Sequence, residues 1–313
     1  MTQFKILITD GLDQSGLEIL RSQAEVDNRK DISADDLLKA IPEYDGLIVR
    51  GRTKVTASVL DAATRLKVIG RAGVGVDNID LAAAKKHNVT VVNAPMSTSV
   101  AVAELTFGLM LALAREIPRA DAGMKQGKWL KKELEGVELN GKTLGVIGFG
   151  RIGVELGKRA AAFGMSVVAY DPLISEDEIA KRGAEPVSIQ DLYAWSDFIS
   201  LHLPLNVQTR DMIGPLAFSQ MKDGARIVCA ARGGIIDETA LVAALNSGKV
   251  AGAALDVYAV EPPGETEAVL HPKVIAMPHI GAQTAEAQSR ASEDIANEVL
   301  SALQDKPLRW KVN

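Results

Sequence analysis

Three polar or charged side chains each follow a predicted β-strand in the second half of the sequence. Arg232 follows the apolar run RIVCAA, Glu261 lies in DVYAVEPP, and His279 ends the run VIAMPH. An imidazole transfers protons near neutral pH, a neighbouring carboxylate raises its pKa, and a guanidinium binds a carboxylate with two hydrogen bonds. Because parallel strands present their carboxyl ends at one sheet edge, we expect these groups to meet there and assist hydride transfer to or from an alcohol.

The other three histidines are weaker candidates for this chemistry. His87 lies at a predicted helix end in KKHNV, and His271 precedes Pro272 in a polar turn, so both are expected to have structural roles. His202 ends the run FISLH, at the sheet edge where ligands collect. A structural role and a role beside a cofactor stay equally open for His202.

A glycine-rich turn, GFGRIG at 148–153, supplies the second chemical feature. It follows the strand-like run LGVIG and leads into the helical pattern VELGKRAAAFG. In this context Gly148 permits a tight turn, Gly150 a close approach of the backbone to a pyrophosphate, and Gly153 close packing of the helix on the strand. The helix N-terminus adds free N–H groups and a positive dipole end, so the segment predicts a dinucleotide site.

The carboxylate of Asp171 indicates which dinucleotide binds. It ends the next predicted strand, SVVAYD, roughly 20 residues after Gly150. A carboxylate there accepts both hydroxyls of the adenosine ribose and repels a 2′-phosphate, so NAD is expected rather than NADP. The similar segment GRAGVGVDNID has Asn78 in place of a third glycine. We interpret it as a loop facing an interdomain cleft.

The elements that position these residues are short β-branched runs alternating with helical patterns, which indicates βαβ units and parallel sheets. We therefore predict two α/β domains, Rossmann-like or flavodoxin-like, with a cleft between them. Residues 1–95 and 287–313 would form a substrate-binding domain, and residues 96–286 an NAD-binding Rossmann domain. The predicted strands lie at 5–10, 45–50, 67–71 and 90–95, and then at 143–148, 166–171, 198–204, 226–231, 252–257 and 274–279.

The segment at 100–116, VAVAELTFGLMLALARE, is apolar on nearly every face of a helix. Such a helix is buried on several sides. It could be a core helix of its domain or a helix shared with a second subunit. Because the charged arm GKWLKKELEGVEL with Trp129 follows it, we expect a homodimer, with a tetramer as the open alternative.

Composition excludes several classes of protein. The 313 residues are 47% hydrophobic and 24% charged, as in soluble enzymes with two cores. A net charge of −5 argues against a nucleic-acid partner, and the longest apolar stretch is too short for a bilayer. The single Cys229 and the lack of a signal-peptide pattern in MTQFKILITDG favour a cytoplasmic protein. No metal is expected.

Taken together, these segments resemble the D-isomer-specific 2-hydroxyacid dehydrogenases over essentially the whole chain. The resemblance rests on GFGRIG…YDP, ARGGIIDE, ALDVYAVEPP and PHIGAQTAEAQ, in that order. VRGRTKVT, GRAGVGVDNIDL and GKWLKKELEGVELNGKTLG are most similar to the phosphoglycerate dehydrogenase branch. This implies NAD-dependent oxidation of 3-phosphoglycerate to 3-phosphohydroxypyruvate, as in serine biosynthesis. It also implies a short form without the C-terminal regulatory domain of longer members.

The resemblance assigns a role to each catalytic candidate. Arg232 would bind the substrate carboxylate and carbonyl, and His279 would be the general acid/base with Glu261 as its partner. Asp256 would accept a hydrogen bond from the nicotinamide carboxamide. The expected cofactor contacts are Gly148, Gly150, Arg151, Ile152, Gly153, Asp171, His202, Leu203, Pro204, Thr209, Ala230, Asp256, Gly281 and Ala282, with the backbone of Arg151 and Ile152 on the pyrophosphate.

Positive charge supports a phosphorylated substrate. Arg50 and Arg52 are two residues apart on a predicted extended segment, so their side chains would point the same way and converge on one anion. The resemblance places both, with Val74 and Gly75, facing the substrate. The opposing interpretation is that Arg52 and Lys54 are solvated surface charges.

Two other functions stay open. A hydroxypyruvate/glyoxylate reductase, or another D-2-hydroxyacid dehydrogenase, would use the same chemistry on a different substrate. An NAD-sensing corepressor-type protein would bind without turnover, since such relatives keep the Arg/Glu/His set. Turnover with a panel of hydroxyacids separates the three.

Overall fold

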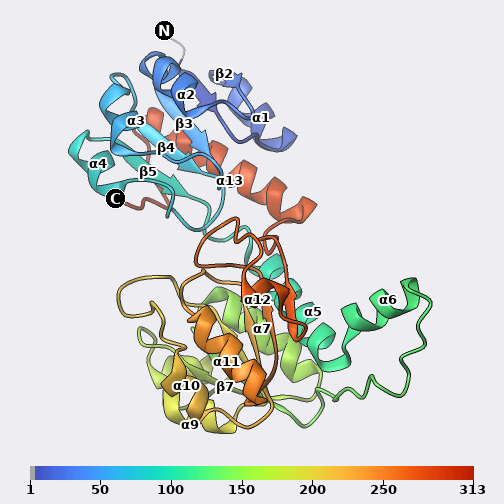
Figure 1. Ribbon diagram of the computed structural model, residues 1–313. Helices are drawn as coiled ribbons and strands as arrows, with labels where there is room; N and C mark the ends of the chain where they lie inside the picture. Colours follow the sequence, from blue (N-terminus) through green and yellow to red (C-terminus); the bar gives the residue numbers. More distant parts are fainter. Residues whose placement is uncertain (1–3) are drawn as a thin grey trace. The chain divides into compact units, whose positions relative to one another are not determined.

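The computed structural model describes residues 4–313, and the chain forms two compact units (Figure 1). Unit 1 comprises residues 1–99 and 282–313, and unit 2 comprises residues 100–281. The chain leaves unit 1 once and returns to it, so the last helix of the sequence completes the first unit.

Unit 1 contains a five-stranded parallel sheet in the order β2-β1-β3-β4-β5. One face is covered by α1 and α13, and the other by α2, α3 and α4, with an apolar cluster under each layer. The strands are β1 (Lys5–Ile8), β2 (Glu25–Asn28), β3 (Gly46–Val49), β4 (Val68–Arg71) and β5 (Thr90–Asn93). The helices are α1 (Gln14–Arg21), α2 (Ala34–Ala40), the 3₁₀ turn η1 (Ile41–Glu43), α3 (Ala57–Ala62), α4 (Leu81–Lys86) and α13 (Ala285–Leu303).

Unit 2 contains a seven-stranded parallel sheet in the order β12-β11-β10-β9-β6-β7-β8. Side chains of α9, α10 and α11 pack on one face, and those of α5, α7 and α8 on the other. The strands are β6 (Thr143–Ile147), β7 (Ser166–Tyr170), β8 (Glu185–Pro186), β9 (Phe198–Leu201), β10 (Ala225–Cys229), β11 (Val250–Leu255) and β12 (Val274–Ala276). The helices are α5 (Ser99–Arg115), α6 (Ile117–Lys125), α7 (Arg151–Ala162), α8 (Glu176–Lys181), α9 (Ile189–Trp195), α10 (Pro215–Gln220), α11 (Glu238–Ser247) and α12 (Glu267–Leu270).

The predicted fold class, two parallel-sheet α/β domains, is confirmed. Every predicted strand run overlaps an observed strand, but β2 and β8 were missed. Both lie at outer edges of their sheets and are at least partly exposed, so their sequences, EVDN and EP, lack the apolar run of a buried strand.

Helix α5 is a core helix of unit 2. Ala103 and Met110 are fully buried, and the helix packs under the sheet beside α7. Helix α6 and the segment after it leave this core (Figure 1), and they expose Ile117, Met124 and Trp129, the last to 76%. Within residues 4–313 no helix is long and apolar enough to cross a membrane.

Candidate active site

Glu261 and His279 form a hydrogen-bonded pair in unit 2. The Nδ1 atom of His279 lies 2.8 Å from Oε2 of Glu261, and Oε1 of Glu261 accepts the backbone N–H of Tyr258 at 3.1 Å. Burial raises the pKa of the Glu261 carboxyl, but the hydrogen bond and charge of His279 outweigh it and hold this pKa below its ordinary value. The carboxylate therefore stays ionised and orients the imidazole, as a proton-transfer pair requires.

The backbone around His279 is held in an uncommon conformation. His279 follows β12 with φ of 53°, in the left-handed region that residues other than glycine rarely adopt. The buried carboxylate of Asp256 accepts the N–H groups of Ile280 at 2.8 Å and Gly281 at 2.7 Å. Burial raises the pKa of Asp256. Asp256 thus fixes the loop after His279, while each oxygen keeps a second acceptor site for the expected nicotinamide contact.

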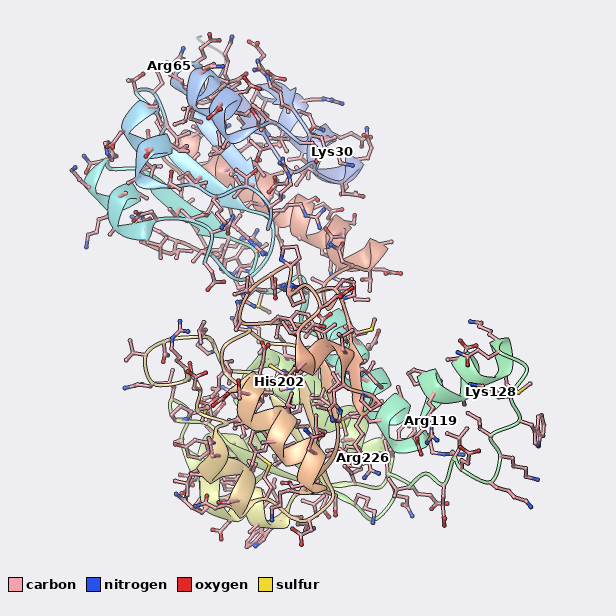
Figure 2. All side chains as sticks on the ribbon, in the orientation of Figure 1. Lys30, Arg65, Arg119, Lys128, His202 and Arg226 are labelled. Atoms are coloured by element: carbon pink, nitrogen blue, oxygen red, sulfur yellow. The ribbon has the colours of Figure 1, made fainter. Side chains whose placement is uncertain are left out.

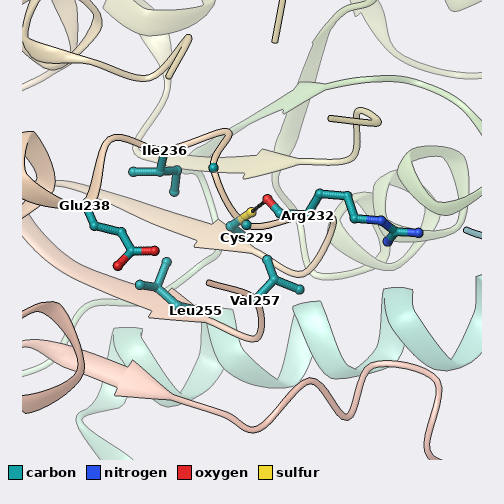
Figure 3. A pocket seen from close by; sticks show the side chains of 8 residues that line it. Cys229, Arg232, Ile236, Glu238, Leu255 and Val257 are labelled. Atoms are coloured by element: carbon teal, nitrogen blue, oxygen red, sulfur yellow. Dashed lines mark hydrogen bonds between the residues drawn. The ribbon is translucent and has the colours of Figure 1, made fainter. Parts of the chain in front are cut away.

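Arg232 lies just beyond β10. Its Nη1 donates to the carbonyl of Ala231 at 2.6 Å, and its charge helps to lower the pKa of Glu261. Figure 3 shows the side chain extending away from a small cavity of about 10 Å³ whose walls include Cys229 and Glu238. The three catalytic candidates therefore occupy consecutive strand ends of one sheet, β10, β11 and β12, and their charges interact.

The Cys229 thiol on that cavity is buried, and burial raises its pKa to about 11. Its Sγ lies 3.7 Å from the carbonyl oxygen of Arg232. A protonated, buried thiol is a poor nucleophile. Cys229 thus packs behind the site and takes no part in its chemistry.

The glycine turn between β6 and α7 has the shape expected of a pyrophosphate cradle. Gly148 has φ of 94°, and a Cβ on Gly153 would lie 2.5 Å from the Gly148 carbonyl oxygen. Gly150 is the N-cap of α7, and nothing lies within 4 Å of where its Cβ would be. This open space at a helix N-terminus has room for the pyrophosphate that the sequence predicts. The contacts of that group with the backbone of Arg151 and Ile152 stay a prediction.

Asp171, at the end of β7, also has contacts that sequence reasoning did not foresee. Its Oδ2 accepts the N–H of Phe149 at 2.8 Å, and its Oδ1 accepts the N–H of Leu173 at 2.9 Å. The carboxylate therefore supports the glycine turn. Its remaining acceptor sites are left for the expected ribose contact.

His202 lies beside this turn, since a Cβ on Gly148 would come within 2.8 Å of the His202 carbonyl oxygen. Its Nε2 is 2.8 Å from the Ser200 hydroxyl, and its buried Nδ1 has no partner among the described residues. Burial lowers the pKa of His202 to about 4, so the imidazole is neutral. The unpaired Nδ1 suits a group that arrives with the cofactor.

The remaining expected cofactor contacts have varied surroundings. Leu203 and Ala230 are largely buried, while the Thr209 hydroxyl donates to the Pro204 carbonyl at 2.7 Å and closes the loop after β9. Gly281 is the last residue of unit 2. Ala282 begins the returning segment of unit 1, where its carbonyl accepts a hydrogen bond from Gln288 at 2.6 Å.

The substrate candidates of unit 1 surround a second strand end. Asp10 accepts the Arg50 N–H at 2.7 Å and the Thr53 hydroxyl at 2.5 Å. Arg52 is exposed but hydrogen-bonds to its own unit: it donates to the Thr9 carbonyl at 2.7 Å and pairs with Asp10 at 3.2 Å. The half-buried Arg50 guanidinium has no hydrogen-bond partner among residues 4–313, and burial lowers its pKa. An anion site in unit 1 therefore depends on Arg50 more than on Arg52.

The loop after β4 lies beside these arginines. Asn78 donates to the carbonyls of Arg50 at 2.9 Å and Thr53 at 2.6 Å. The Val74 carbonyl accepts from the Asn93 side chain at 2.7 Å, and Gly75 is half-buried. Asn78, which stands where a dinucleotide motif would have its third glycine, thus links two loops of unit 1 by hydrogen bonds.

The two histidines expected to be structural have structural partners. His87 caps α4 and lies 2.8 Å from Asp61, and Nε2 of His271 lies 3.2 Å from the Asn246 side chain. Neither of these two contacts involves Glu261 or His279.

Comparison with known proteins adds independent findings. Residues 107–281 match the D-isomer specific 2-hydroxyacid dehydrogenase, NAD binding domain. The D-3-phosphoglycerate dehydrogenase of Rattus norvegicus is 47% identical over 310 residues, which cover 99% of this chain and 58% of that protein. The chain therefore spans little more than half the length of this relative.

Solved structures cover the whole chain. A glyoxylate reductase from Paecilomyes thermophila has a TM-score of 0.91 at 32% identity, covering 100% of this chain and 99% of that chain. The D-lactate dehydrogenase from Aquifex aeolicus, complexed with NAD and lactic acid, has a TM-score of 0.84 at 30% identity, covering 96% of each chain.

Proposed function

Because this chain belongs to the D-isomer-specific 2-hydroxyacid dehydrogenase family, we propose that it oxidises a D-2-hydroxyacid with NAD, and that the substrate is 3-phosphoglycerate. The product would be 3-phosphohydroxypyruvate, in serine biosynthesis. The family and NAD as the cofactor of its domain agree with the expectation from sequence. The single observation that carries the proposal is the Glu261–His279 hydrogen bond, with the Arg232 charge acting on it.

The chain's own groups account for the proton and for orientation of the substrate. Because Nδ1 of His279 faces Glu261, Nε2 is the atom left to accept the substrate hydroxyl proton. The Glu261 carboxylate then stabilises the imidazolium. Arg232 binds the substrate carboxylate, which fixes the carbon that loses its hydride. NAD bound at the glycine turn supplies the acceptor for that hydride.

Support for a phosphorylated substrate comes from unit 1, which we propose to be the substrate-binding domain. Arg50 provides a half-buried cation whose guanidinium makes no hydrogen bond within residues 4–313, and Arg52, Val74 and Gly75 belong to the adjoining loops. A phosphate takes several charge-assisted hydrogen bonds, so it suits such a cation. The relatives named D-3-phosphoglycerate dehydrogenase favour the same substrate.

A second candidate function is reduction of glyoxylate or hydroxypyruvate. One solved structure that is similar over nearly the full length of both chains is a glyoxylate reductase, and nothing in the Glu261–His279 pair selects between the two substrates. Comparison of kcat/KM for 3-phosphoglycerate with kcat/KM for D-glycerate distinguishes the two candidate functions. A phosphate site should favour the former by on the order of 10² or more. Equal use of both would favour the reductase.

We also propose a cytoplasmic homodimer. Arg119 and Lys128 mark the projecting arm of α6 and the segment after it (Figure 2), whose apolar side chains, Ile117, Met124 and Trp129, are exposed. At its base a hollow of about 680 Å³ lies between the end of α5, Arg226 and edge strand β12. A second copy would cover this surface. Sedimentation as a 33.3 kDa monomer at micromolar concentration would refute the dimer.

A further inference from the structure

The peptide groups of the glycine turn are held from two sides. Phe149 is the middle residue of Gly148-Phe149-Gly150, and its N–H donates to Asp171 at 2.8 Å. Its carbonyl oxygen accepts a hydrogen bond of 3.1 Å from Nη1 of Arg182. Asp171 follows β7, whereas Arg182 is the C-cap of α8, 33 residues from Phe149 in sequence. Asp171 thus holds the peptide group between Gly148 and Phe149, and Arg182 holds the one between Phe149 and Gly150.

Arg182 is itself held in place. Its Nε donates to Oε1 of Glu178 at 2.9 Å, one helical turn earlier on α8, and its side chain is 34% exposed. The helix has its own supports in the N-cap Ser175 and the buried Ile179. The guanidinium is therefore not needed to anchor α8, and its Nη1 is directed at the turn by the bond to Glu178.

The direction of one N–H group follows from this contact. In a trans peptide the C=O and the N–H point in opposite directions, and the Phe149 carbonyl belongs to the same peptide as the Gly150 N–H. By holding the oxygen on one side, Arg182 directs the Gly150 N–H to the other. Nothing lies within 4 Å of the Cβ position of Gly150, at the N-terminus of α7.

We propose that Arg182 is a positioning residue for the cofactor, which orients the Phe149–Gly150 peptide so that its N–H faces the pyrophosphate. The inference rests on the proposed function only in that NAD binds at this turn. A turn that is already oriented binds more tightly because less conformational freedom is lost on binding. Arg182 acts on affinity for the cofactor and has no role in proton transfer at His279.

The test is titration of the purified chain with NADH, followed by fluorescence, for wild type and Arg182→Ala. We expect the dissociation constant to rise on the order of tenfold, as when a hydrogen bond from a charged group is lost. The matched control is Lys181→Ala, which removes the same charge from the neighbouring position on α8 and should leave the constant unchanged. ADP-ribose, which has the pyrophosphate but lacks nicotinamide, should lose affinity by the same factor.

Further readouts distinguish positioning from general loss of structure. KM for NAD should rise in Arg182→Ala while kcat at saturating NAD stays at the wild-type value. Arg182→Lys should recover part of the affinity for NADH. Glu178→Gln removes the ion pair that holds Arg182 but keeps the guanidinium itself, so it should lower the affinity for NADH less than Arg182→Ala does. Binding of NADH within twofold of wild type by Arg182→Ala would overturn the inference. Failure of the wild type to bind NADH would instead overturn the proposed function.

Discussion

Two glycine-rich loops follow parallel strands within residues 4–313, and only one of them leads directly into a helix. After β6, Gly148-Phe149-Gly150 leads directly into α7, and the space at Gly150 is open. After β4, Gly73-Val74-Gly75 leads instead to a loop. There Asn78 takes the third motif position and hydrogen-bonds to the carbonyls of Arg50 and Thr53.

The difference shows that a Gly-x-Gly start does not by itself produce an open helix N-terminus. What matters is whether a helix begins at once, so that its free N–H groups face open space. In unit 2 charged groups hold the turn from behind, through Phe149, and leave its front open. In unit 1, by contrast, the Asn78 side chain and the Val74 carbonyl of the corresponding loop form hydrogen bonds with neighbouring segments of the same unit. This difference agrees with the match of residues 107–281, within unit 2, to an NAD-binding domain.

The largest expected effect comes from the catalytic pair of unit 2. His279→Gln should lower turnover by on the order of 10²–10⁴, the range for loss of a general acid/base. NADH affinity should stay close to wild type, because the glycine turn is untouched. Steady-state kinetics with parallel NADH titration measures both. His271→Gln is the control, since His271 bonds to Asn246 outside the site. Wild-type turnover in His279→Gln would reject the assignment of the site to this sheet edge.

The next effect concerns the choice of cofactor. Wild type should prefer NAD to NADP by at least about tenfold, because the Asp171 carboxylate repels a 2′-phosphate. Asp171→Asn keeps one oxygen that can accept the Phe149 N–H, but it loses the charge and the oxygen that accepts the Leu173 N–H, so this preference should narrow. Asp171→Ala should in addition weaken the binding of both NAD and NADP. Ratios of kcat/KM for NAD and NADP test this, and an unchanged ratio in Asp171→Asn would contradict it.

A third prediction tests the comparison of the two loops directly. Asn78→Gly completes a G-x-G-x-x-G pattern in unit 1, yet we expect NADH to bind at one site per chain, as before. The variant should be less stable by about 1–3 kcal/mol, because two hydrogen bonds, to Arg50 and Thr53, are lost. Titration calorimetry gives the stoichiometry and urea unfolding the stability. A second NADH site would show that motif spacing alone is sufficient.

Sequence patterns predicted the strands and the Glu261–His279 pairing because both depend on residue type at strand ends. They did not predict the contacts of Arg52 with Thr9 and Asp10, for a definite reason. Alternation of side chains applies within a strand, but β3 ends at Val49, and the bend that follows turns Arg52 back to Thr9 and Asp10. The contacts of Asp171, Asp256 and Arg182 with backbone N–H and C=O groups leave no sequence signal, since any residue supplies those groups.

The last and smallest effect distinguishes the two sheet edges by pH. The edge of unit 1 carries Arg50, which stays charged at every ordinary pH. The edge of unit 2 carries His202, whose pKa burial lowers from 6.5 to about 4. Between these values the unfolded chain binds a proton that the folded chain does not, so stability falls as the pH drops through this window.

From pH 7 to pH 5.5 this group alone should cost about 1 kcal/mol of unfolding free energy. The side chain in His202→Asn is not protonated in either state. Over the same pH interval this variant should therefore lose about 1 kcal/mol less unfolding free energy than wild type. Urea unfolding at the two pH values measures both proteins. Equal losses in wild type and His202→Asn would mean that His202 is protonated as easily in the folded chain as in the unfolded one. The imidazole beside the glycine turn would then be accessible to water, and its Nδ1 would not be reserved for the cofactor.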